Sequence, residues 1–202
     1  MKLRSMAALA LVLLVAMAAC KKESTDGLPN TETTGTAQSP STATTDPTTT
    51  GATGGTSTTV APADGEFVSK AGMGGLAEVQ MGNLGLSKAT SADVKAFAQR
   101  MVTDHSKANE ELSQLATAKG VALPTELDGD HKAALDHLTS LTGADFDKAY
   151  MKHMVEDHEK DVAEFDKAST TAGDSDLKAW AGKTLPTLKE HLQLAKTVSS
   201  KT

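Results

Sequence analysis

Cysteine is nearly absent from this chain, and aromatic residues are scarce. Cys20 is the single cysteine among 202 residues, so no disulfide can form within the chain. Aromatic residues make up 3% of the sequence, whereas alanine, leucine, lysine and the acidic residues are plentiful. This composition favours helices over sheets.

Motifs of the common catalytic mechanisms are also missing. The sequence contains no Gly-x-Ser-x-Gly turn around a nucleophilic serine and no glycine-rich phosphate-binding loop. Its formal net charge is −6, which becomes −8 once Lys2 and Arg4 are removed with a leader. An acidic chain of this kind argues against a nucleic-acid partner. Without these motifs, a non-enzymatic role is favoured over an enzymatic one.

The one long apolar run lies close to the N-terminus. Residues 7–19 read AALALVLLVAMAA and follow Lys2 and Arg4, an arrangement typical of a secretory signal peptide over residues 1–19. The run is too short to cross a bilayer as a helix. Cys20 follows two alanines, as the acylated cysteine of a bacterial lipoprotein does. Because an exposed free thiol is unusual in a secreted protein, we expect lipidation of Cys20, with plain cleavage and a free thiol as the alternative.

The residue after the cysteine bears on location. Lys21 is not the aspartate that marks retention at the inner membrane. The sequence therefore predicts an outer-membrane lipoprotein that faces the periplasm or the cell surface. A lipidated Cys20 carries more than one acyl chain, which is enough for stable attachment to a membrane.

The segment 20–65 is too polar to form a core. Threonine, serine, glycine, proline and alanine dominate it, and the first aromatic residue after the leader is Phe67. Such a segment buries too little apolar surface to offset the entropy of ordering, so we expect a disordered linker. The remaining residues, 66–200, have the size of one domain.

Apolar residues recur at helical spacing throughout that domain. The stripe on the second expected helix, for example, has spacings of three and four residues from Val94 to Leu115. Thr90 with Asp93 has the spacing of a capping pair at its start. Four long helices and one short one are expected, at about 66–89, 91–119, 130–141, 144–170 and 175–198. The pattern predicts an all-α, ferritin-like up-down four-helix bundle with a short extra helix in the crossover.

A twelve-residue segment occurs twice, 53 residues apart. MVTDHSKANEEL begins at Met101, and MVEDHEKDVAEF begins at Met154. The repeat suggests a duplicated helical hairpin, in which His105 and His158 take related positions in one core.

Several stretches resemble a known bacterial family. They are FVSKAGMGGLAEVQMG, KAFAQRMVTDHSKANEEL, LPTEL, FDKAYMKHMVEDHEKDVAEF and LKAWAGKTLPTLKEHL, within residues 67–197. They are similar to the family called domain of unknown function 4142. The resemblance implies a ferritin-like fold and an envelope location, and it implies no settled activity.

Three histidines lie on inward stripes of three different helices. They are His105, His158 and His191, and Glu78 lies on the small-residue face of the first helix. One polar group per helix is how bundles build metal sites, and imidazole with carboxylate suits Zn, Cu, Fe or Ni. The carboxylates that di-iron bundles place three residues before each histidine are replaced here by Val102 and Val155. This departure weakens an iron oxidase interpretation.

Two alternatives remain for these residues. Met101 and Met154 each precede a histidine by four residues, which suits Cu(I), although methionine in a helical stripe is commonly core. The histidines and Glu78 can also form a buried polar network that holds no metal.

These observations support two functional hypotheses. The first is a non-enzymatic envelope lipoprotein whose bundle serves binding or stress tolerance, with partners that the sequence does not specify. The second is a bundle that sequesters or buffers Cu or Zn in the periplasm. A redox enzyme that uses the same metal is a weaker third.

Overall fold

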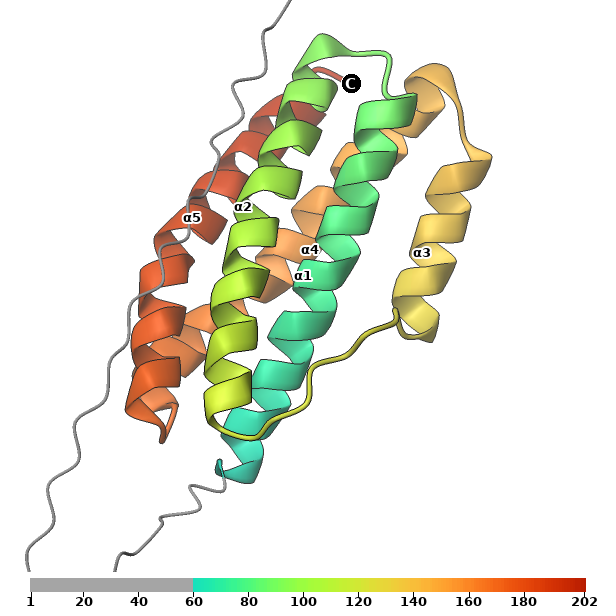
Figure 1. The fold of residues 1–202 in the computed structure, drawn as a ribbon. Coiled ribbons are helices and arrows are strands. Elements are labelled where there is room, and N and C mark those ends of the chain that lie inside the picture. The colour runs from blue at the N-terminus through green and yellow to red at the C-terminus, as the bar shows by residue number, and fades with distance from the viewer. Residues whose placement is uncertain (1–59) are drawn as a thin grey trace, which may run out of the picture. The chain divides into compact units, whose positions relative to one another are not determined.

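The computed structural model describes residues 60–202, all of whose regular structure is helical (Figure 1). Five helices follow one another: α1 Pro62–Lys88, α2 Ala92–Ala118, α3 Gly129–Ser140, α4 Gly143–Thr171 and α5 Ser175–Ser199. The all-α bundle expected from the sequence is confirmed, and the short helix lies in the crossover. The expected leader, lipidated Cys20 and most of the expected linker lie outside the described residues.

The four long helices form two antiparallel pairs. α1 packs with α2, α4 packs with α5, and contacts of α1 with α4 and of α2 with α5 close the bundle. The crossover carries α3 along the outside, so that α2 and α4 run in the same direction on opposite corners (Figure 1). The twelve-residue repeat therefore relates diagonal helices. The interpretation that it marks two equivalent hairpins is wrong, because it matches the second helix of one pair with the first helix of the other.

A buried carboxylate from α4 holds the start of α2. Asp147 accepts hydrogen bonds from the backbone N–H of Thr90 at 3.0 Å, from its hydroxyl at 2.6 Å and from the N–H of Ser91 at 2.8 Å. Ser91 is the N-cap, and its side chain accepts from the N–H of Val94. The expected capping role of Thr90 is wrong, because a partner 57 residues away satisfies this residue instead.

At the opposite end of the bundle, another buried carboxylate holds the start of a neighbouring helix. Asp64, in the first turn of α1, accepts from the N–H groups of Gly173 and Asp174 at 3.1 and 2.8 Å, just before α5. Asp64 is 4% exposed. α1 begins at Pro62, four residues before the expected start of the domain. The contacts of Asp64 make the first turn of this helix part of the packed domain.

Small residues bring α1 close to α2. A Cβ atom at Gly82 would lie 2.7 Å from Cγ2 of Val102 and 3.2 Å from the carbonyl oxygen of Ala98. Any side chain there would push the two helices apart. Gly82 follows Glu78 by one turn, so this close approach also sets how far the Glu78 carboxylate reaches into the bundle.

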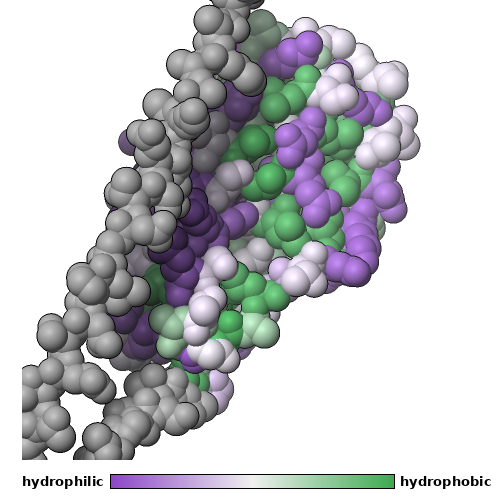
Figure 2. Space-filling model, in the orientation of Figure 1, coloured by the Kyte–Doolittle hydropathy of each residue, from purple (hydrophilic) through white to green (hydrophobic). Residues whose placement is uncertain are grey.

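The apolar core is divided into two clusters along the bundle. One cluster includes Met81, Phe97, Met151 and Ala195, and the other includes Val68, Leu112, Phe165 and Leu188. The surface is mixed: over α1 and α3, Figure 2 shows polar and apolar residues interspersed. No described helix has both the length and the continuous apolarity that crossing a membrane requires.

Candidate functional site

A polar layer separates the two apolar clusters, and each long helix contributes one residue to it. Along each helix, its member lies between residues of one cluster and residues of the other. The members are Glu78 of α1, His105 of α2, His158 of α4 and His191 of α5, and their exposures are 0, 6, 0 and 0%. The buried His/Glu cluster expected from the sequence is thus present. Burial of four ionisable groups is costly unless they are paired, so the layer requires a specific explanation.

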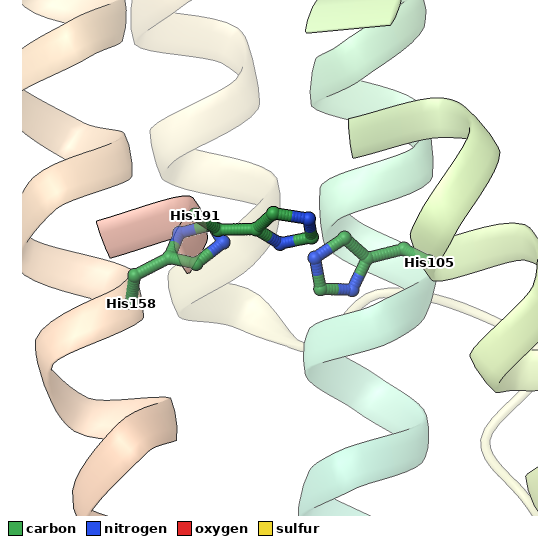
Figure 3. A group of neighbouring side chains, drawn as sticks. All are labelled: His105, His158 and His191. Carbon is green, nitrogen blue, oxygen red and sulfur yellow. The ribbon is translucent and has the colours of Figure 1, made fainter. Parts of the chain in front are cut away.

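The three imidazoles converge on one point. One ring nitrogen of each histidine lies within 4.8 Å of the corresponding nitrogen of the other two. Figure 3 shows His105, His158 and His191 turned toward one another from three separate helices. Centroid distances between the rings are 5.3–5.7 Å.

Two of the rings are oriented by acceptors outside the cluster. His158 Nδ1 lies 2.9 Å from the carbonyl oxygen of Met154, and His191 Nε2 lies 2.8 Å from Oδ2 of Asp104. Because both partners only accept, those nitrogens carry the protons. In its neutral form, each ring therefore presents its lone pair on the other nitrogen, which is Nε2 in His158 and Nδ1 in His191. A hydrogen bond of this kind on the far ring nitrogen is the usual support of a metal-binding histidine.

Glu78 lies between two of the histidines. Its Oε2 is 2.7 Å from His105 Nδ1, and its Oε1 is 3.2 Å from His158 Nε2. These contacts are close, but neither has the alignment of a hydrogen bond. Five buried atoms of the cluster lack hydrogen-bond partners: Glu78 Oε1 and Oε2, His105 Nε2, His158 Nε2 and His191 Nδ1.

Charges within the layer shift the pKa values of its members. Burial opposes ionisation of Glu78, but the positive charges of His105 and His158 outweigh it and lower the pKa of Glu78 to about 2. Burial likewise disfavours a charged His105, yet the Glu78 carboxylate raises the pKa of this ring overall. Burial and repulsion by the other two histidines lower the pKa of His191 to about 4, despite its bond to Asp104. At neutral pH the layer therefore contains an ionised Glu78 and a neutral His191.

The acidic residue that precedes each repeated histidine has a role in the structure. Asp104 joins His191 to Arg100, whose Nε lies 3.2 Å from Oδ2 of Asp104. Asp157 is buried and 8% exposed, so it is not a solvated surface residue. Asp104 orients the ring of His191 from outside the cluster.

The two candidate methionines lie in the apolar core. Met101 and Met154 are fully buried and belong to the same apolar cluster. The contact that links Met154 to His158 runs through its backbone carbonyl oxygen. The i, i+4 spacing of methionine and histidine in the sequence is therefore explained in α4 by a backbone contact, and the packing of both side chains matches ordinary core methionine.

Sequence reasoning missed Asp161. Carboxylate oxygens of Glu78, Asp157 and Asp161 lie within 4.8 Å of one another. Burial and the charge of Glu78 raise the pKa values of both aspartates. The only signal in the sequence was the i, i+4 spacing of two acids on α4, which is equally common on solvated helix faces. The three remaining histidines lie outside the cluster: His137 is exposed, while His131 and His153 are partly buried.

We expect acidification to destabilise the metal-free protein through His191. The unfolded ring takes up a proton near pH 6.5 and the folded ring near pH 4, so the unfolded state binds more protons between these values. Stability is therefore lost as the pH falls through this window, by about 2–3 kcal/mol for this group. Urea denaturation at pH 7 and pH 4.5 measures the loss, and His191→Gln should show less of it. An equal loss in this variant contradicts the assignment.

Comparisons with known proteins agree with the family resemblance and with the helical fold. A family model for DUF4142, a domain of unknown function, matches residues 49–198. Among solved structures, the chain is similar to a crystal structure of a DUF305 fragment from Deinococcus radiodurans, with a TM-score of 0.63 and 12% identity over 71% of this chain and 99% of that one. At this identity the likeness shows the fold alone. No protein with a curated description matches the chain significantly. Because the family match spans most of its length, the chain belongs to the DUF4142 family.

Proposed function

We propose that this bundle is a metal-binding module that holds one divalent transition-metal ion, Zn²⁺ or Cu²⁺. The ligands are His105, His158 and His191, and Glu78 is the fourth. One observation carries the proposal: three convergent imidazoles are buried together with nitrogens that have no partner in the protein. Imidazole with carboxylate is a ligand set that suits these metals.

A closed polar network explains the same residues less well. In such a network each buried donor and acceptor has a partner, whereas here His105 Nε2 and His191 Nδ1 have none and the contacts of Glu78 with His105 and His158 lack hydrogen-bond alignment. Each unsatisfied buried group costs about 1–3 kcal/mol. A bound cation would satisfy all three imidazoles and the carboxylate at once.

The distances allow such an ion after small side-chain movements. Zn–N bonds of about 2.0–2.1 Å place tetrahedral ligand atoms about 3.3 Å apart. The imidazole nitrogens lie within 4.8 Å of one another, so a slight contraction of the layer brings them into range. Four protein ligands would leave no open position for substrate, which suits storage or buffering of the metal more than catalysis.

The N-terminal features complete the proposal. A lipidated Cys20 would tether the bundle to the outer membrane through the linker 20–65, and a protein so placed would sequester or buffer metal in the periplasm. If Cys20 is the anchor, Cys20→Ala moves the protein from the membrane fraction to the soluble periplasmic fraction. A variant that stays in the membrane fraction contradicts this placement.

Metal content is the test of the function. Residues 21–202 contain every described helix and omit Cys20, whose thiol would compete for metal. After incubation with Zn²⁺ or Cu²⁺ and dialysis, elemental analysis should give one ion per chain. His158→Gln should lose it, and His137→Gln, which alters an exposed histidine on α3, should retain it.

A negative result has an equally definite meaning. Wild-type protein without retained metal would contradict the proposal and leave the other function expected from the sequence, a metal-free envelope module for binding or stress tolerance. The same holds if His158→Gln and His137→Gln retain the same amount of metal.

A further inference from the structure

A second set of possible ligands adjoins the three histidines. Oxygens of Glu78, Asp157 and Asp161 lie within 4.8 Å of one another, on the side of Glu78 that faces α4. Of these residues, only Glu78 also contacts the histidines. The carboxylate of Glu78 has two oxygens with two lone pairs each, so it can serve two neighbours.

An unpartnered buried atom marks this place. Asp157 is 8% exposed, and its Oδ2 has no hydrogen-bond partner. The same side chain lines a cleft of about 420 Å³ between α1, α3 and α4. Its wall also includes His153 and Asp161, and two lysines, Lys70 and Lys160, line its rim. The cleft gives a small solute a route to Asp157 and Asp161, whereas the opening beside Glu78 and His105 is only about 20 Å³.

The three carboxylates repel one another unless a positive charge joins them. Glu78 is balanced on its other side by His105 and His158. Asp157 has no comparable partner, and Asp161, half-buried beside it, adds a further negative charge. His153 and Lys160, which line the same cleft, offset part of this charge. A shared proton or a bound cation can offset the rest, and space for a hydrated cation lies next to it.

We propose that Asp157 and Asp161 hold a second cation, bridged to the three-histidine centre by Glu78. An all-carboxylate position with room for water suits a hard divalent ion such as Mn²⁺ rather than Cu²⁺. The outer ion is exchangeable through the cleft, whereas the inner ion is enclosed by the bundle. The proposal goes beyond the three-histidine site and shares only Glu78 with it.

The probe is Mn²⁺, added to residues 21–202 that have been given one equivalent of Zn²⁺. Electron paramagnetic resonance measures the free Mn²⁺ that remains. Wild-type protein should bind one Mn²⁺ per chain, and Asp161→Asn should weaken this binding by at least about tenfold. Asp166→Asn is the matched control, because it removes an exposed carboxylate from the same helix and should leave the affinity unchanged.

Two further measurements keep the test decisive. Asp161→Asn should have a thermal midpoint without metal no lower than that of the wild type, since it removes a repulsive charge and keeps the shape. This result excludes misfolding as the cause of weak binding. His191→Ala should lose Zn²⁺ and keep Mn²⁺, because His191 belongs only to the inner cluster.

The outcomes for the two sites are separable. Zn²⁺ binding without Mn²⁺ binding overturns the second site and leaves the first. Mn²⁺ binding without Zn²⁺ binding overturns the first and supports the second. Equal Mn²⁺ affinities in Asp161→Asn and Asp166→Asn also overturn the second site, because binding would then be a general property of surface acids.

Discussion

Replacing Glu78 with alanine is expected to lower the free energy of unfolding of the metal-free protein by about 3 kcal/mol. Glu78 is fully buried between His105 and His158. The Glu78 carboxylate is what raises the pKa of His105. Without it, the His105 ring must either lose its proton or remain as an unpaired buried charge. This loss of stability is at the lower end of the range for breaking a buried ion pair, about 3–5 kcal/mol. The reason is that the substitution also removes the repulsion between the charge of Glu78 and those of Asp157 and Asp161.

A surface pair provides the control for this prediction. Glu111 lies 2.8 Å from Lys183, which is 65% exposed, so Glu111→Ala should cost about 0–1 kcal/mol. Urea denaturation at pH 7 without metal compares the two variants. If Glu78→Ala costs no more than Glu111→Ala, the buried ion pair does not hold the layer together.

The second large effect is stabilisation of the wild-type bundle by metal. An ion at a concentration of 100 times its dissociation constant stabilises the folded state by about 2.7 kcal/mol. For a domain of this size, that corresponds to a rise in thermal midpoint of roughly 5–10 °C. Differential scanning calorimetry with and without Zn²⁺ measures the shift, and His158→Gln should abolish it.

The pH dependence of this stabilisation tests whether the metal binds at the histidines. The ion must displace the proton that Glu78 favours on His105, so metal affinity should fall as the pH is lowered. A shift in midpoint that is equal in wild type and His158→Gln, or that does not weaken on acidification, would place the metal elsewhere.

The helices could be predicted because their apolar residues follow helical spacing over several turns. The histidines at positions 105, 158 and 191 fall on those stripes, so their burial was predictable, and Glu78 stood out as an acid on a face of small residues. Burial of a face follows from the periodicity of its own segment. The four residues of the polar layer could therefore be predicted from the sequence.

The partners of these residues were less predictable, because they come from distant segments. Asp147 holds Thr90 from 57 residues away, and His191 meets Asp104 from 87 residues away. Asp161 was missed because a flank of a helix looks polar in sequence whether it faces water or a neighbouring helix. Only the packing of α4 against α1 turns that flank toward Glu78.

X-ray absorption at the zinc edge tests the central claim most directly, because it counts the atoms bound to the metal. For residues 21–202 loaded with one equivalent of Zn²⁺, we expect imidazole scattering from three histidines and one oxygen ligand, with Zn–N distances of about 2.0–2.1 Å. His191→Ala should reduce the imidazole count by one. A spectrum that contains only oxygen ligands, or one that is unchanged in His191→Ala, would contradict a metal centre in the polar layer.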